Sequence, residues 1–138
     1  CCWQLQVVSR TRFRVNGKLE SYRDLEVWKV SMQLAREVYQ STEGMPKHEI
    51  YGLTSQIRRA SVSVPANIAE GYGRNHRKEY LQFLGIANGS LKELETLLLL
   101  AHDLNYIDDI TKLMSLCESA GRLLNRLRQS LQRGIDNY

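Results

Sequence analysis

Hydrophobic side chains recur along residues 22–132 at alternating spacings of three and four, the period of one face of an α-helix. The pattern predicts four helices, over residues 22–39, from residue 47 or 49 to 72, over 76–105 and over 108–132. Short loops between long helices place neighbours antiparallel, so the sequence predicts an all-α, antiparallel, up-and-down four-helix bundle with left-handed packing. The predicted core positions, helix by helix, are Leu25, Trp28, Met32, Ala35 and Tyr39; Leu53, Ile57, Ala60, Val64 and Ile68; Tyr80, Leu84, Ala87, Leu91, Leu94, Leu98 and Ala101; and Ile110, Leu113, Cys117, Ala120, Leu124, Leu127 and Leu131.

Polar residues and glycine mark where the helices begin and end. Ser21 is the predicted N-cap of the first helix, with Asp24 in the position of a capping box. Asn75 is the predicted N-cap of the third helix, and Gly134 is predicted to end the fourth. These signals agree with the boundaries that the hydrophobic period predicts.

The second helix contains a proline in its interior. The ring of Pro65 removes one backbone donor and clashes with the preceding turn, so a kink is expected near residues 61–64 rather than a break. Gly71 and Gly73 are predicted to end this helix in a left-handed cap.

The third helix is hydrophobic on more than one side. Residues 97–100 are four consecutive leucines, and a second apolar stripe lies beside the predicted core stripe. One interpretation is that this helix is buried more deeply than its neighbours; the other, which we favour, is self-association, because monomers rarely expose such patches. The candidate oligomer-interface residues are Phe83, Ile86, Leu97, Leu100 and Leu104.

Length and charge separate residues 1–20 from the rest of the chain. The 138 residues suffice for one domain with its own core, and no apolar run is long enough to span a membrane. Residues 1–20 lack the helical pattern and hold four basic and one acidic side chain, so we interpret them as a leader or flexible arm outside the core. Residues 21–138, the predicted bundle domain, hold 15 basic and 14 acidic side chains, so overall charge does not indicate a polyanion partner.

The chemistry-bearing side chains give no catalytic pattern. His48, His76 and His102 lie far apart in sequence, and no phosphate-binding loop, nucleophile elbow or dinucleotide fingerprint is present. The three cysteines form no disulfide framework, and Cys117 falls on an apolar stripe, where a thiol packs as a small hydrophobe. The sequence therefore predicts no enzyme, cofactor or metal site, and a reducing, cytoplasmic location.

Two groups of basic residues are candidates for contact with phosphates. One surrounds the end of the second helix and the start of the third, with Tyr72 and Tyr80 interleaved as candidate platforms for stacking a base. The other is the arginine-rich end of the fourth helix. The alternative interpretation is solubility together with ion pairs to Glu93, Glu95 and Asp103. The candidate nucleic-acid-binding residues are Arg58, Arg59, Arg74, Arg77 and Lys78.

Four stretches occur together in a characteristic order: residues 22–29 (YRDLEVWK), 51–60 (YGLTSQIRRA), 64–74 (VPANIAEGYGR) and 79–84 (EYLQFL). In this combination the chain resembles the bacterial four-helix-bundle family of 23S ribosomal RNA intervening-sequence proteins, over about residues 19–131. The positions that match the family motif are Arg58, Arg59, Asn67, Glu70, Gly71, Gly73, Arg74, Glu79 and Tyr80.

The resemblance implies a protomer that assembles as a ring-shaped homopentamer without known catalytic residues. The family is also similar to the accessory variability determinant of diversity-generating retroelements, a pentameric bundle that binds nucleic acid and a reverse transcriptase. Two functions follow as hypotheses: a nucleic-acid-binding accessory protein acting on RNA or DNA, such as ribosomal RNA, or an oligomeric scaffold that binds another protein. We favour the first.

Overall fold

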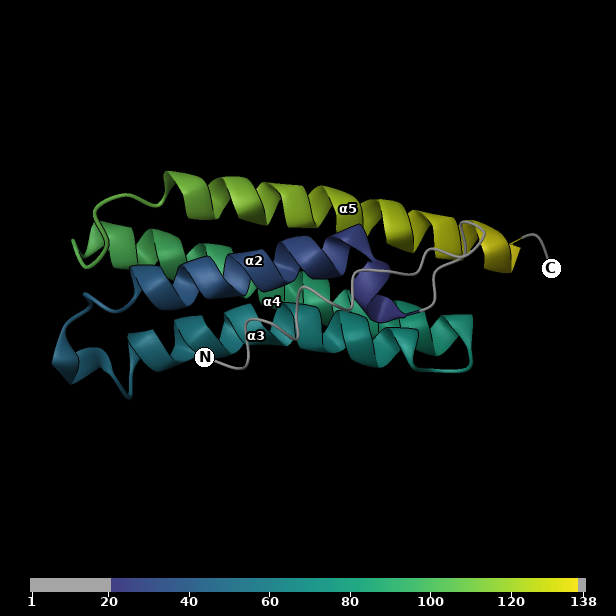
Figure 1. The fold of residues 1–138 in the computed structure, drawn as a ribbon, viewed down its shortest axis with the longest axis horizontal. Helices are drawn as coiled ribbons and strands as arrows, with labels where there is room; N and C mark the ends of the chain where they lie inside the picture. Colours follow the sequence, from purple (N-terminus) through teal and green to yellow (C-terminus); the bar gives the residue numbers. More distant parts are fainter. Residues whose placement is uncertain (1–20, 137–138) are drawn as a thin grey trace, which may run out of the picture.

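The structure, a computed structural model, describes residues 21–136, which form four long helices and no strand. α3 packs against α2 and α4, and α5 packs against the same two helices, so the four helices stand at the corners of a square (Figure 1). The predicted all-α four-helix bundle is confirmed, whereas the prediction for residues 1–20 lies outside the described residues. The helices are α2 Glu26–Ser41, α3 Leu53–Tyr72, α4 Arg77–Asp103 and α5 Thr111–Asp136, with short 3₁₀ turns η1 Tyr22–Asp24 before α2 and η2 Lys47–Glu49 before α3.

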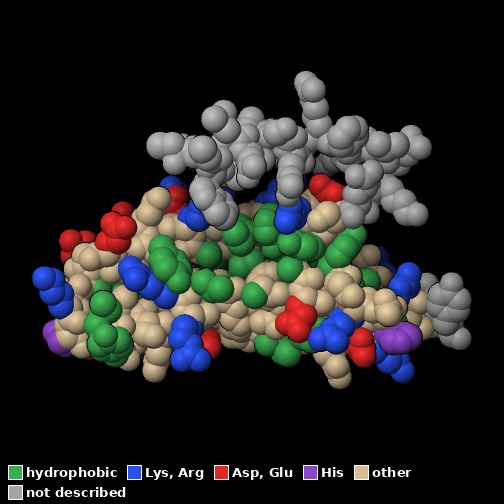
Figure 2. Space-filling model, turned by 60° about the horizontal axis from the view of Figure 1, so that its bottom comes forward, with side chains coloured by type: hydrophobic (Ala, Val, Ile, Leu, Met, Phe, Trp, Pro, Cys, Tyr) green, Lys and Arg blue, Asp and Glu red, His purple; other side chains and the backbone are tan. Residues whose placement is uncertain are grey.

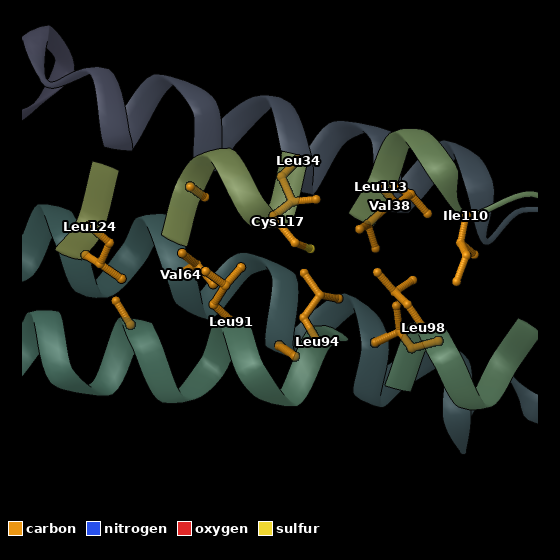
Figure 3. Packing of buried hydrophobic residues seen from close by; sticks show 14 of the residues in the cluster. Leu34, Val38, Val64, Leu91, Leu94, Leu98, Ile110, Leu113, Cys117 and Leu124 are labelled. Atoms are coloured by element: carbon orange, nitrogen blue, oxygen red, sulfur yellow. The ribbon is translucent and has the colours of Figure 1, made fainter. Parts of the chain in front are cut away.

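The core is built from the heptad stripes of α3, α4 and α5. Every predicted core position of α3 is buried, as are those of α4 from Leu84 onward and those of α5 up to Leu124. Figure 3 shows Leu91, Leu94 and Leu98 of α4 pointing toward the other helices across the bundle axis. The sequence pattern therefore predicted these three faces correctly.

The predicted core face of α2 was correct in part. Leu25 and Ala35 are buried as predicted, and Trp28 and Met32 are half-buried. The other buried residues of α2 are Val27, Ser31, Leu34 and Val38, whereas Tyr39, predicted as core, is exposed. The Ser31 hydroxyl donates a 2.6 Å hydrogen bond to the Val27 carbonyl within the helix, and this contact lets a polar residue occupy the core. A serine in the stripe and aromatic residues beside it made the outer face look more hydrophobic than the inner one.

Several helix ends also differ from the predictions. The Ser21–Asp24 capping box is present, but it caps the 3₁₀ turn η1 instead of α2. The N-cap of α4 is His76 rather than Asn75, and it makes no side-chain capping bond. α5 begins at Thr111, whose N–H donates to Asp109 Oδ1 at 2.9 Å. This backbone hydrogen bond lowers the pKa of Asp109.

Gly71 and Gly134 lie inside helices, each against side chains of another helix, whereas Gly73 directly follows the last residue of α3. Gly71 lies buried inside α3, and Gly73 has a right-handed conformation (φ −75°), so the predicted left-handed cap is wrong. α5 continues through Gly134 to Asp136. α3 runs without a break through Pro65, as predicted, while the bend at this residue stays a prediction.

α4 ends in the left-handed cap that α3 lacks. Asn105 has φ 60°, and the two residues that follow the helix turn back on it: Asn105 N–H donates to the His102 carbonyl at 2.9 Å and Tyr106 N–H to the Ala101 carbonyl at 2.9 Å. These two bonds define a Schellman motif, in which asparagine tolerates the left-handed region better than other non-glycine residues. The turn between α4 and α5 is fixed by this cap.

We expect Asn105→Ala to lower the free energy of unfolding by about 1 kcal/mol, because Ala gains no local hydrogen bond that offsets a positive φ. Urea denaturation measures this change. Asn105→Gly serves as the matched variant and should equal or exceed the wild type in stability. An Ala variant as stable as the Gly variant would contradict the assigned cap.

Candidate nucleic-acid interface

The structure divides the five predicted nucleic-acid-binding residues between two parts of the bundle. Arg58 and Arg74 are sixteen residues apart across α3 and its C-terminal end, which corresponds to about 24 Å at 1.5 Å per residue. Arg59 lies beside Arg58 in sequence but on the other side of α3, as its contacts show below. Only Arg74, in the turn from α3 to α4, and Arg77 and Lys78, in the first turn of α4, remain as one group.

Arg58 connects α3 to the end of α2. Its Nε donates to Thr42 Oγ1 at 2.9 Å, and its guanidinium lies 4.8 Å from the centre of the Tyr39 ring. A further hydrogen bond of 3.5 Å reaches the Tyr39 carbonyl. Arg58 therefore joins two helices. A phosphate that binds Arg58 would compete with these contacts to Thr42 and Tyr39.

Arg59 faces α4 instead. The side chain borders an open hollow of about 380 Å³ between α3 and α4, lined by Gln56, Arg59, Ala60, Ser63 and Glu93. At the edge of this hollow the hydroxyls of Ser63 and Ser90 lie 2.8 Å apart, which ties the two helices together. Neither Arg59 nor Glu93 forms an ion pair in the part of the chain that the structure describes.

The turn from α3 to α4 and the first turn of α4 present three exposed cations. Arg74 pairs with Glu70 at 3.1 Å, and its guanidinium lies 4.8 Å from the centre of the Phe83 ring. Arg77 lies directly against Gly134 of α5, where a Cβ atom would collide with the guanidinium. Lys78 is exposed and has no ion-pair partner among residues 21–136.

The contact of Arg77 with Gly134 brings the arginine-rich end of α5 next to this turn. Residues 21–24, 70–79 and 126–136 meet at one end of the bundle, which we call the basic end (Figure 1). Its seven basic and four acidic side chains are Arg23, Arg74, Arg77, Lys78, Arg126, Arg128 and Arg133, and Asp24, Glu70, Glu79 and Asp136.

The opposite end, formed by residues 42–58 and 101–112, is acidic. Its charged side chains are Lys47, Arg58 and Lys112 against Glu43, Glu49, Asp103, Asp108 and Asp109. The even charge balance of the domain therefore hides a polarity along the bundle. The sequence did not reveal this polarity, because it becomes apparent only when the charged residues are grouped by the end of the bundle at which they lie.

An aromatic cluster fills the space between helices near the basic end. Tyr22 packs edge-to-face on Trp28 (5.4 Å between centroids) and on Tyr72 (6.5 Å), and Tyr72 packs on Tyr80 (6.2 Å). The Tyr80 hydroxyl is buried without a hydrogen-bond partner in the described residues, and burial raises the pKa of Tyr80 to about 12. These rings serve internal packing, so the exposed groups of this end are mainly charged side chains, of which the cations are the more numerous.

The motif residues of α3 support the fold around its C-terminal half. Asn67 Nδ2 donates to the Ser63 carbonyl at 2.7 Å and to Ser63 Oγ at 2.9 Å, and Glu70 holds Arg74. Gly71 lies against Tyr80 and Phe83 of α4. Asn67 therefore binds a backbone carbonyl and a serine hydroxyl of its own helix, and Glu70 binds an arginine.

The histidines and the cysteine of the described residues lie far apart. His48, His102 and Cys117 have the following contacts or environments. His102 Nδ1 lies 3.1 Å from the Ile107 carbonyl, and His48 lies 3.8 Å from Glu49. Burial, with a smaller effect of Glu95, raises the pKa of Cys117 to about 12, so this thiol packs in the core in its protonated form. No group of three potential metal ligands occurs within the described residues, and no helix there has the length and hydrophobicity to cross a membrane.

The predicted interface residues on α4 differ in exposure. Ile86, Leu100 and Leu104 expose 52%, 45% and 47% of their surface, whereas Phe83 and Leu97 are half-buried. The leucine run is therefore not explained by burial within the protomer alone. The exposed side chains leave an apolar surface along α4.

Comparison with known proteins places this fold in a family. No curated protein sequence matches the chain. A crystal structure of a protein of unknown function from the S23 ribosomal protein family of Bacteroides thetaiotaomicron is similar to it, with a TM-score of 0.55 and 24% identity over 76% of this chain and 94% of the other. The model of the family described as "23S rRNA-intervening sequence protein" matches residues 23–126. This match spans most of the bundle, and the chain therefore belongs to the 23S rRNA-intervening sequence protein family.

Proposed function

We propose that this protein is a non-enzymatic, nucleic-acid-binding accessory protein that acts in the cytoplasm as a ring-shaped homo-oligomer, most simply a pentamer. The observation that carries the proposal is the basic end, where Arg74, Arg77 and Lys78 meet the arginines of α5. Membership of a family named after an rRNA intervening sequence makes ribosomal RNA the first polyanion to test.

The basic end suits phosphate groups better than a single protein partner. Arginine forms forked hydrogen bonds to phosphate oxygens, and the three cations in and directly after the α3–α4 turn are exposed at a short connection between rigid helices. One such group binds a polyanion weakly. A ring repeats it in every protomer, so that several weak contacts act on one nucleic acid.

The experiment is a salt titration of binding to structured ribosomal RNA and to a random duplex. We expect the double substitution Arg74→Gln with Arg77→Gln to reduce the slope of log affinity against log salt by about 2 for each engaged protomer, because each lost phosphate contact removes about 1. Arg122→Gln is the matched control, since Arg122 is an exposed arginine near the middle of α5. Unchanged affinity and slope in the double variant would refute the proposal.

Residues 1–20 need a separate comparison, because they carry four basic side chains and could bind phosphates themselves. The same titration with Arg10, Arg12 and Arg14 changed to Gln measures their share. Binding that disappears in this variant, yet persists in the Arg74/Arg77 variant, would assign the nucleic-acid contact to residues 1–20.

The second candidate function is a protein-binding oligomeric scaffold. It is favoured by the nearly even charge of residues 21–138 and by the pairing of Arg74 with Glu70. A protein that forms the oligomer but binds neither RNA nor DNA at about 50 mM salt would support the scaffold.

A further inference from the structure

α4 carries two heptad stripes, one of which lies on the outside of the bundle. Beside the buried core stripe, the positions Phe83, Ile86, Ser90, Glu93, Leu97, Leu100 and Leu104 recur at spacings of three and four. We call this second stripe the α4 seam. Contacts of Ser90 with Ser63 and of Phe83 with Gly71 show that it follows the α3 side of α4. Such a stripe is typical of a helix that packs against another helix outside the protomer.

Glu93 interrupts the α4 seam at its midpoint. This carboxylate lines the hollow beside α3 and forms no ion pair in the described part of the chain. If two copies paired through their α4 seams about a two-fold axis, Glu93 would face Glu93 of the other copy, and like charges in close contact oppose association. The surface that fits the seam is therefore apolar with a cation near its centre.

The same chain presents such a surface between α2 and α3. We call it the α2–α3 face; its residues are Trp28, Met32, Arg36, Tyr39, Arg58 and Val62. Tyr39 and Val62 are exposed, and Arg58 lies over the Tyr39 ring. Arg36 is exposed and has no ion pair among residues 21–136. Figure 2 shows hydrophobic side chains gathered along the α3 side of the bundle with Lys and Arg side chains among them.

We propose that the α4 seam of one copy docks on the α2–α3 face of the next copy, with Glu93 facing Arg36 and Arg58. The proposal rests on the self-association included in the proposed function and deepens it by naming both surfaces. Because the two surfaces differ, the contact is head-to-tail. Every copy contacts one neighbour through its α4 seam and the other neighbour through its α2–α3 face. Arg58 then belongs to the contact between copies and not to the phosphate-binding group.

The placement of the two surfaces favours a closed ring over a filament. In the square arrangement of helices, the α2–α3 face and the α3–α4 side are adjacent, so they point in directions about 90° apart. Head-to-tail contacts at such an angle curve the row of copies, and the row closes as a ring where successive copies have no shift along its axis. If the two surfaces lay on opposite sides of the bundle, successive copies would form a straight row that does not close.

Charge reversal tests the pairing in the full chain, with light scattering coupled to size exclusion as the readout. Glu93→Arg and Arg36→Glu are each expected to weaken association at least about tenfold, because each brings like charges together. The chain with both substitutions should recover part of the association lost in each single variant, since the pair with position 36 is restored with opposite sign while Arg58 keeps its charge. Glu118→Arg, an equal charge change on the exposed face of α5, is the control and should leave the mass unchanged.

Mixing two variants distinguishes head-to-tail from two-fold contacts. One variant loses the seam through Leu100→Glu with Leu104→Glu, and the other loses the face through Arg36→Glu with Val62→Glu; all four side chains are exposed. Each variant alone should be monomeric, and an equimolar mixture should form a 1:1 dimer. Circular dichroism melts of both confirm that they are folded.

The outcomes separate the two levels of the proposal. A wild-type chain that stays monomeric near 15.9 kDa would overturn self-association itself and this inference with it. A wild-type oligomer that survives both single charge reversals would overturn only the assigned surfaces. A face variant that dimerises on its own through an intact seam would show two-fold pairing and refute the head-to-tail contact.

Discussion

Leu94→Ala is expected to lower the free energy of unfolding by about 2–5 kcal/mol. Leu94 has no exposed surface and lies in the middle of α4, where Figure 3 shows it among side chains from other helices. Truncation removes buried apolar area and leaves a cavity that rigid helices fill only in part. Urea denaturation at a fixed protein concentration measures the change, since self-association would otherwise contribute to stability.

Leu99→Ala is the matched control on the same helix. Leu99 exposes 48% of its surface and belongs to neither stripe of α4, so its truncation should change stability by less than about 1 kcal/mol. Similar losses for Leu94→Ala and Leu99→Ala would contradict the orientation of α4 in the bundle.

The second large effect is expected at Gly71, where Gly71→Ala should destabilise the protein by about 1–3 kcal/mol. A Cβ atom there would lie 2.8 Å from Phe83 Cβ and 2.9 Å from Tyr80 Cδ2, closer than carbon atoms approach without displacement. α4 would have to move away from α3 near the basic end. Thermal unfolding followed by circular dichroism measures the loss.

Gly85→Ala gives a control of opposite sign. Gly85 also lies inside a helix, but nothing comes within 4 Å of its Cβ position. Alanine there should stabilise the helix by about 0.5–1 kcal/mol, because it removes the backbone entropy that glycine loses on folding. Two changes of the same sign would show that helix propensity, and not the close approach of α3 and α4, governs Gly71.

The faces of α3, α4 and α5 could be predicted from the sequence because their core positions are almost all aliphatic. For α2 only Leu25 and Ala35 were correctly predicted as buried, since Ser31 lies in the core with its hydroxyl bonded to the Val27 carbonyl of the same helix. α3 ends at Tyr72 as predicted, but the left-handed cap at Gly71 and Gly73 and the end of α5 at Gly134 were wrong. Gly71 and Gly134 each lie against side chains of another helix, and the spacing of residues in the sequence does not indicate those contacts.

The candidate site shows the same division between local and long-range information. Arg74, Arg77 and Lys78 are close in sequence and stay together in space. Arg58 and Arg59 are adjacent in sequence but contact α2 and border α4 respectively, because successive residues of a helix point about 100° apart. The C-terminal part of α5 lies beside Arg77 because of the lengths of α4 and α5, and this contact is visible only in the folded bundle.

The opposite charge of the two ends gives the elongated bundle an electric dipole along its long axis. The field of a polyanion exerts a torque on such a dipole before any contact forms, so the molecule approaches with its basic end first. In the proposed ring, cyclic symmetry would preserve the dipole component along the ring axis, and the copies would add their components instead of cancelling them. For the proposed binding of a polyanion, orientation during approach would make the association rate, more than the dissociation rate, sensitive to ionic strength.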